Sequence, residues 1–260
     1  MATPRILLTN DDGIGSVGFR ALYDALSEVA DVTAVAPATD QSAVGRALSH
    51  EVTVSDHELG YVVEGTPVDC AVIGLEALRP DADMVVAGCN KGANLGAYVL
   101  GRSGTVSAAV EAAFFGVPAM AVSLYVPGGD VSWTDAATDS EDYREATAAS
   151  TYLVENALDA GVFEEAEYLN VNAPMPGDSP ARLAVTRPST LYDMTASREG
   201  ESVRLRDRVW DRMREGDLPE PDGTDRKAIV DGNVSVSPLT APHTTRRHDE
   251  LDRLAASYRG

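Results

Sequence analysis

The start of the chain carries the pattern that most restricts its fold. Residues 5–9 are centred on a continuous apolar run, which is typical of a strand buried on both faces. The large apolar residues between 19 and 29 are then spaced by 3, 4 and 3 positions, which predicts one face of a helix. Residues 32–36 form another short apolar run. Strand, helix and strand in this order predict a βαβ unit and therefore a parallel sheet.

The same theme continues to about residue 125. Thr66 and Pro67 are typical of a helix N-cap and first helical position. We expect further helices at 66–78 and from Ser103, further strands at 84–87 and 118–123, and an edge hairpin at 51–55 and 61–64. The predicted fold class is α/β: a doubly wound, Rossmann-like, mostly parallel sheet.

Beyond residue 130 the pattern is looser. We expect a helix at 140–158 and strands at 168–172 and 183–186, whereas 195–232 is charged with few apolar anchors. From about His243 the pattern predicts a polar helix with Leu251 and Leu254 on its inner face. We therefore expect one structural domain. Residues 1–130 would form the core, and 131–260 would complete the sheet and add an extended oligomerisation region and a C-terminal helix.

The charge of the chain limits its partners. The 260 residues include 41 Asp and Glu but only 21 Lys and Arg, for a net charge of −20. Such a surface repels phosphate backbones, which argues against a nucleic-acid polymer as partner. Only Lys91 and Lys227 are lysines. An acid excess with so little lysine favours a halophilic source, although an ordinary acidic mesophilic protein would also fit.

Other features indicate a cytoplasmic protein. The N-terminus has no signal-peptide pattern, and the uncharged stretch 112–129 is interrupted by glycine and proline, which argues against a membrane span. Cys70 and Cys89 cannot form a multi-disulfide framework and lack the spacing of metal ligands.

Polar clusters follow several of the predicted strands or open a helix. They are 10–13, 40–42, 88–94 and 103–105. Because ligands of open parallel sheets gather at the carboxyl ends of strands, we expect these clusters to converge.

Asp11 and Asp12 are the central pair. Adjacent carboxylates at the end of a buried strand repel each other unless a cation neutralises them. Oxygen ligands favour Mg²⁺ or Mn²⁺ over zinc. Two simpler origins of the pair stay open, because adjacent acids arise by chance in so acidic a chain and Asn-Asp-Asp-Gly is also ordinary turn chemistry.

An overlapping motif offers a different function. Gly13, Gly15 and Gly18 match G-x-G-x-x-G between a strand and a helix, with Asp40 some way on, which is the dinucleotide-binding pattern. The alternative is therefore a Rossmann-type oxidoreductase or binding module. Against it, Asp11 and Asp12 would stand where a pyrophosphate must approach.

Two further groups are candidate ligands. Asn90 and Asn94 lie among glycines, so their amides could ligate a metal or bind phosphate, although a plain turn-rich loop is as good an interpretation. Ser103, Gly104 and Thr105 at a helix start offer free N–H groups to an anion, or are simply an N-cap.

These motifs together resemble the SurE family of stationary-phase survival phosphatases. The resemblance rests on 6–13, the Gln41-Ser42 loop, 65–70, 88–96, 103–106, 169–172 and 232–239, in this order along the chain. It implies a phosphomonoesterase that hydrolyses nucleoside 5′- and often 3′-monophosphates, sometimes polyphosphate, as a homodimer or homotetramer.

The resemblance also implies a ligand set. One divalent cation per subunit, Mg²⁺ or Mn²⁺, would be held by Asp11, Asp12, Ser42 and Asn90. We expect Asp11 and Asp12 to be catalytic, and Asn94 and Ser103, Gly104 and Thr105 to bind phosphate. Arg46 departs from the family pattern after Ser42, and Ser107 and Ala112 replace glycines typical of the family. We expect Arg46 to affect substrate preference and rate but not the metal site, and the two others to affect helix packing only.

Overall fold

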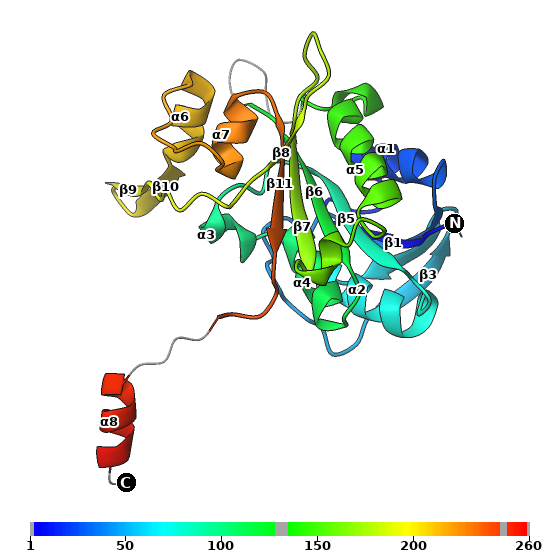
Figure 1. Cartoon of the computed structure of the whole chain (residues 1–260), viewed down its shortest axis with the longest axis horizontal. Coiled ribbons are helices and arrows are strands. Elements are labelled where there is room, and N and C mark those ends of the chain that lie inside the picture. Colours follow the sequence, from blue (N-terminus) through cyan, green and yellow to red (C-terminus); the bar gives the residue numbers. More distant parts are fainter. Residues whose placement is uncertain (1–2, 128–134, 245–248, 259–260) are drawn as a thin grey trace.

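A computed structural model of this chain describes residues 3–127, 135–244 and 249–258. Within these residues nine strands form one sheet in the order β3-β4-β2-β1-β5-β6-β7-β11-β8 (Figure 1). Their bounds are β1 Arg5–Thr9, β2 Asp31–Pro37, β3 Thr53–His57, β4 Gly60–Glu64, β5 Met84–Lys91, β6 Ala119–Tyr125, β7 Tyr168–Pro174, β8 Leu183–Val185 and β11 Val234–Leu239.

The central strands are parallel. β4, β2, β1, β5, β6 and β7 pair in parallel, whereas β3 is antiparallel to β4 and β11 is antiparallel to β7. The predicted parallel sheet with an edge hairpin is confirmed. From β1 the chain proceeds to β2 on one side and later to β5 on the other. The strand order therefore reverses at β1 and β5, which is where open α/β sheets bind ligands.

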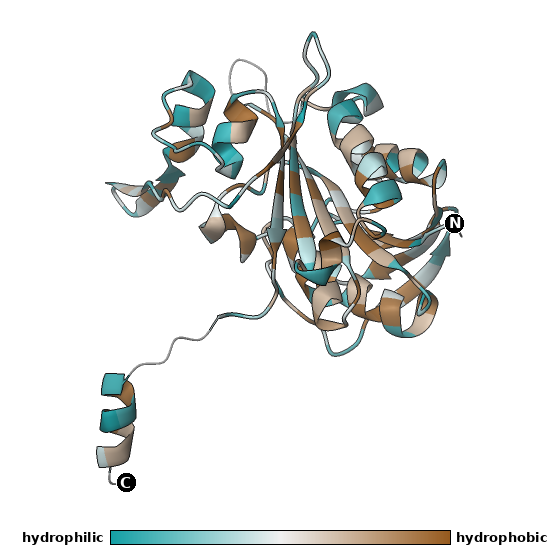
Figure 2. Cartoon of the chain, in the orientation of Figure 1, coloured by the Kyte–Doolittle hydropathy of each residue, from teal (hydrophilic) through white to brown (hydrophobic). Residues whose placement is uncertain are grey.

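Helices cover both faces of the sheet. Helices α1 (Val17–Ser27) and α5 (Arg144–Asn156) pack on one face, and α2 (Pro67–Ile73) and α4 (Gly104–Phe114) on the other (Figure 1). The alternation of side chains along β1 explains both layers, because Leu8 faces α1 and Leu7 faces α2. Figure 2 shows apolar residues concentrated in the strands and on the helix faces toward them.

Local sequence signals explain where α2 begins and ends. The Thr66 hydroxyl accepts a hydrogen bond from the Asp69 N–H at 3.2 Å, and the Asp69 carboxylate accepts one from the Thr66 N–H at 2.8 Å. This capping box starts the helix as predicted. The single helix expected over 66–78 is instead α-helical only to Ile73 and continues as a π-helical turn, Gly74–Leu78.

The charged stretch 195–232, which we expected to belong to an extended oligomerisation region, contains regular secondary structure. It forms the hairpin of β9 (Met194–Glu199) and β10 (Ser202–Asp207), then α6 (Val209–Glu215) and α7 (Asp225–Val230). Val209, Met213 and Ile229 make a small separate core with Leu95. Val209 and Met213 are one helical turn apart, but Leu95 and Ile229 are far from them in sequence, so no local periodicity reveals the whole cluster.

The C-terminal helix is present, but its predicted inner face is wrong for a single chain. Helix α8 (Asp249–Ser257) stands apart from the sheet (Figure 1), and Leu251 and Leu254 are 62% and 67% exposed. Residues 245–248, where we expected the helix already to be formed, lie outside the described residues. In the part of the chain that the structure describes, no helix is both long and apolar enough to span a membrane.

Candidate active site

The candidate site lies where β1 and β5 end. Asp11 and Asp12 follow β1 directly, and Ser42 lies in the loop after β2. The strand expected over 84–87 extends to Lys91, with an irregular register between Ala87 and Asn90. Asn90 therefore belongs to the end of β5 rather than to the glycine-rich loop that we expected from residue 88.

Asp11 is buried and firmly held. Its side chain is 3% exposed, and its Oδ1 accepts a hydrogen bond from the Thr105 hydroxyl at the start of α4. Its backbone carbonyl accepts the Gln41 N–H at 2.7 Å, which ties the first loop to the second. Gly104 allows this approach, since a Cβ there would lie 2.8 Å from the Asp11 Cβ. Burial raises the pKa of Asp11 although the Thr105 bond opposes it.

Asp12 faces the end of β5. Its Oδ2 accepts the backbone N–H of Lys91 at 2.7 Å. Burial raises the pKa of Asp12 to about 7, and the negative charges of Asp11 and Asp40 add to the rise, whereas the Lys91 N–H opposes it. The two acids thus sit in a place that disfavours their negative charge and that a cation would relieve.

A cavity of about 320 Å³ opens beside Asp12. It is lined by Asp12, Ser16, Val17, Asp40, Ser42, Lys91, Ala137, Thr138 and Tyr143. Of the predicted site residues, Asp12 and Ser42 line this cavity. The Asp40 carboxylate accepts the Ser42 N–H at 2.7 Å and so fixes the turn that carries Ser42.

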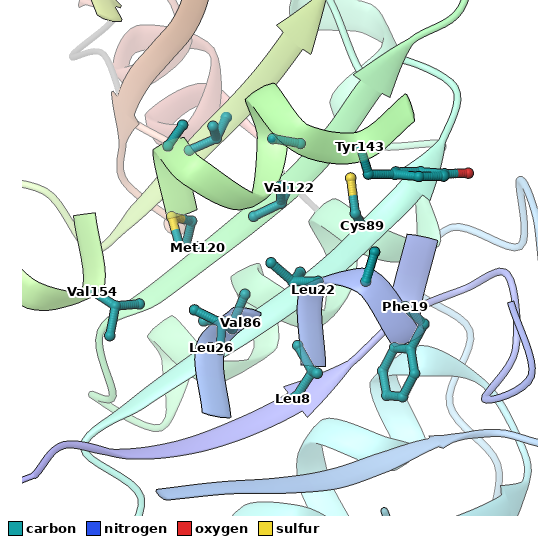
Figure 3. Packing of buried hydrophobic residues seen from close by; sticks show 14 of the residues in the cluster. Leu8, Phe19, Leu22, Leu26, Val86, Cys89, Met120, Val122, Tyr143 and Val154 are labelled. Atoms are coloured by element: carbon teal, nitrogen blue, oxygen red, sulfur yellow. The ribbon is translucent and has the colours of Figure 1, made fainter. Parts of the chain in front are cut away.

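Tyr143 is a cavity residue that sequence reasoning missed. It is buried, donates a hydrogen bond to the Ala137 carbonyl at 3.2 Å, and lies close to Cys89 (Figure 3). A Cβ on Gly18 would lie 2.5 Å from the Tyr143 ring and 2.4 Å from the Cys89 carbonyl. The glycine of the apparent dinucleotide motif is therefore required for helix packing. A glycine at this position signals close packing, but it does not identify Tyr143 as the partner.

Asn90 and Asn94 are placed differently from each other. The Asn90 amide donates to the Gly92 carbonyl at 2.5 Å and so shapes the loop. Asn94 does not line the cavity; its Nδ2 donates to the Ser123 hydroxyl at 2.9 Å, and its backbone N–H donates to Asn172 at 2.8 Å.

The start of α4 is capped in the ordinary way. The Ser103 hydroxyl accepts the Val106 N–H at 3.1 Å, and the Ser107 hydroxyl donates to the Ser103 carbonyl at 2.6 Å. Gly104 and Thr105 contact Asp11, so this helix start belongs to the same cluster as the paired acids. Ala112 is fully buried within α4, in the core on that face of the sheet.

Arg46 contacts α4. Its guanidinium pairs with Glu111 at 2.6 Å and lies 5.0 Å from the centre of the Phe114 ring. Arg46, the residue that departs from the family pattern, thus has two partners on α4. They hold its charge at the surface of that helix.

The donor set fits a hard divalent cation. Asp11, Asp12, Ser42 and Asn90 offer carboxylate, hydroxyl and amide oxygens, the ligand types that Mg²⁺ and Mn²⁺ prefer. The raised pKa of both carboxyl groups fits the same assignment. Among the described residues there is no group of three or more His, Cys, Asp or Glu side chains arranged to hold a metal.

Comparison with known proteins gives a consistent result. The family profile described as "Survival protein SurE" matches residues 6–194. The protein named "5'-nucleotidase SurE" of Haloarcula marismortui is 65% identical over 99% of this chain and 96% of its own length. Proteins of the same name from Natronomonas pharaonis and Methanoculleus marisnigri are 64% and 40% identical over 97% and 99% of this chain and 99% and 98% of their own lengths.

A solved structure has the same fold. The SurE protein from Aquifex aeolicus superposes with a TM-score of 0.80 at 28% identity, over 97% of this chain and all of that one. The halophilic origin of relatives such as that from Haloarcula agrees with our interpretation of the acidic composition. By sequence profile, by relatives aligned over nearly its full length and by fold, this chain belongs to the SurE survival-protein family.

Proposed function

We propose that this chain is a metal-dependent phosphomonoesterase that hydrolyses nucleoside 5′-monophosphates to nucleoside and phosphate. The observation that carries the proposal is the pair of Asp11, which is buried, and Asp12, which lines the cavity; Thr105 and the Lys91 N–H hold them where the strand order reverses. The name of its relatives, "5'-nucleotidase SurE", supports the substrate class. Nucleoside 3′-monophosphates and polyphosphate are proposed as further substrates.

One divalent cation per subunit, Mg²⁺ or Mn²⁺, would be held by Asp11, Asp12, Ser42 and Asn90. When bound, it supplies positive charge that polarises a phosphoryl group and favours deprotonation of an attacking water. The hydrogen bond from Thr105 keeps the Asp11 carboxylate in one orientation. Because the Asp11 carboxylate is already oriented, it does not have to be ordered during the reaction.

Phosphate oxygens would be held by Ser103, Gly104, Thr105 and Asn94. The N-terminus of α4 offers backbone N–H groups and the positive end of the helix dipole. An amide nitrogen carries two hydrogens, and the bond from Asn94 to Ser123 uses one of them. These donors would stabilise negative charge that develops on the phosphoryl group during displacement.

We also propose that the chain works in the cytoplasm as a homodimer or homotetramer. Apolar side chains that a single chain leaves uncovered support the association. Val203 and Leu205 on the β9–β10 hairpin are 56% and 70% exposed, and Leu251 and Leu254 on α8 are also exposed. Contact between subunits would remove these surfaces from water.

A phosphatase panel tests the function directly. The protein, loaded with Mn²⁺ in molar KCl, is assayed on nucleoside 5′- and 3′-monophosphates, polyphosphate and sugar phosphates. We expect 5′-monophosphates to be the best substrates. The Asp11→Asn variant is expected to lose activity by roughly a hundredfold or more while keeping its fold, because the buried charge is removed without changing the shape of the side chain. Unchanged turnover by this variant would exclude the proposed role of Asp11.

A further inference from the structure

Two fully buried charged residues lie at the start of α7, far in sequence from the paired acids. Asp225 and Arg226 are both 0% exposed. They face the glycine-rich loop after β5, whose residues Asn94, Leu95 and Gly96 precede α3 (Ala97–Leu100). Neither residue is part of the site described above.

Asp225 accepts three backbone hydrogen bonds. Its Oδ2 accepts the Gly96 N–H at 2.7 Å, and its Oδ1 accepts the N–H groups of Ser189 and Arg226 at 2.9 and 2.8 Å. One carboxylate therefore joins α7, the segment before β9 and the glycine-rich loop. A carboxylate is suited to this role because it is acceptor-only on both oxygens.

Arg226 holds the neighbouring residue of the loop. Its Nη2 donates to the Leu95 carbonyl at 3.1 Å, and its Nη1 donates to the Leu191 carbonyl at 2.8 Å and to the Ser189 hydroxyl at 3.1 Å. The guanidinium also lies 5.1 Å from the centre of the Tyr98 ring. A Cβ on Gly96 would lie 2.3 Å from Nη2, so this contact needs glycine there.

Other contacts hold the same short loop. The Leu95 side chain is fully buried against α6 and α7, among Val209, Met213 and Ile229. On the side toward β7, Asn170 donates to the Asn94 carbonyl at 2.9 Å, in addition to the bond that Asn94 gives to Asn172. Asn94, Leu95 and Gly96 are thus held between β7 and α7.

Stability alone does not explain a buried guanidinium. Removing such an ion from water costs several kcal/mol, and an apolar side chain often serves stability as well or better. What a guanidinium adds is a fixed planar set of donors aimed at chosen carbonyl groups. Here one of those carbonyl groups belongs to Leu95, one residue from Asn94.

We propose that Asp225 and Arg226 are positioning residues for the phosphate site: by fixing the backbone of Leu95 and Gly96, they set the direction of the loop that carries Asn94 and follows Asn90. This inference rests on the proposed function. It gives the C-terminal helices α6 and α7 a part in the reaction without contact with substrate.

The test compares four variants of α7 and its C-terminal end, one of which is the conservative change Arg226→Lys. Asp225→Asn keeps the size of the side chain but replaces one acceptor oxygen by a donor, and Arg226→Met keeps bulk without the donors. Asp231→Asn is the matched control, because the Asp231 carboxylate, one residue beyond the same helix, pairs with Lys227 at the surface. Each is measured for kcat and KM, for hydrogen exchange of residues 90–97, and for helix content by circular dichroism.

We expect Asp225→Asn and Arg226→Met to lower kcat by about tenfold to a hundredfold, the loss that small misplacements produce. KM should change less than about threefold, and exchange over 90–97 should accelerate while helix content stays unchanged. Arg226→Lys should recover part of kcat because it keeps one donor. The control should match the wild type in every measurement.

A kcat within twofold of the wild type, together with unchanged exchange in both test variants, would overturn the inference. If Arg226→Met does not fold, Asp225→Asn decides alone. Failure of the proposed function has a different signature, since the wild-type protein would then hydrolyse no nucleotide. In that case the exchange of residues 90–97 still reports whether Asp225 and Arg226 fix the loop.

Discussion

Thr105 and Asp11 lie 94 positions apart in the sequence, yet the threonine hydroxyl donates directly to the aspartate Oδ1. Both side chains are buried, so the bond is shielded from water. It joins the start of α4 to the end of β1 across the point where the strand order reverses. The orientation of a proposed metal ligand therefore depends on a helix that belongs to one face of the sheet.

Replacing Thr105 by valine tests this dependence. Valine keeps the shape but removes the hydroxyl donor to the Asp11 carboxylate, which should lower the free energy of unfolding by about 1–3 kcal/mol. Activity on a nucleoside monophosphate should fall by about tenfold or more. Thr105→Ser keeps the hydroxyl and should retain most of both. Urea unfolding and steady-state kinetics measure the two effects; a valine variant as active as the serine variant would contradict the prediction.

Metal removal separates the proposed function from the dinucleotide alternative. Dialysis against EDTA should abolish phosphatase activity, and Mn²⁺ or Mg²⁺ should restore it, because the paired carboxylates need a cation. The melting temperature should rise again on adding Mn²⁺, increasingly so as the metal concentration exceeds its Kd. Asp12→Asn should weaken that rise. A protein whose activity and melting temperature ignore EDTA would not be a metallophosphatase.

The raised pKa of Asp12, about 7, predicts how the metal-free protein responds to pH. Between about pH 4 and pH 7 the folded chain retains a proton that an unfolded aspartate, with its pKa near 3.9, has released. Stability should therefore fall as pH rises through this window, by an amount on the order of a few kcal/mol. Melting temperatures at pH 5 and pH 8, in EDTA and constant KCl, measure the decline.

The Asp12→Asn variant is the control for this pH effect. It lacks the titrating group, so its melting temperature should decline less between pH 5 and pH 8 than that of the wild type. Bound Mn²⁺ should also make the decline of the wild-type melting temperature smaller, because the cation takes the place of the proton. Parallel curves for the two metal-free proteins would contradict the assignment.

The net charge of −20 predicts that the fold depends on salt. At low ionic strength the carboxylates repel one another over distances that molar salt screens. The melting temperature should rise by several degrees from dilute buffer to molar KCl. EDTA in every sample keeps the screening effect apart from metal binding. Equal melting temperatures in the two buffers would rule out this role of salt.

Local patterns predict the first half of the fold well. The run at Ile6–Leu8 and the spacing of Phe19, Leu22 and Leu26 reflect burial against immediate neighbours, so the sequence alone indicates β1 and α1. Asp11, Asp12 and Ser42 could be singled out because parallel strands direct their carboxyl ends to one edge. That rule needs only the order of the elements.

The remaining features depend on contacts between distant segments. Tyr143 reaches the cavity at the far end of the long connection between β6 and α5, and Leu95 packs with Val209 more than a hundred residues later. No periodicity within a short window encodes such pairs. The pattern of Leu251 and Leu254 indicates an amphipathic helix, but it cannot indicate what covers the apolar side. In the single chain the two leucines expected on the inner face are therefore exposed.

The position of Asp225 and Arg226 has a consequence for how the protein is made. A nascent chain that has emerged from the ribosome as far as α4 already holds Asp11, Asp12, Asn90 and Thr105. The groups that fix Leu95 and Gly96 are synthesised more than a hundred residues later. The loop next to the paired acids can therefore be locked in place only after translation has passed the start of α7.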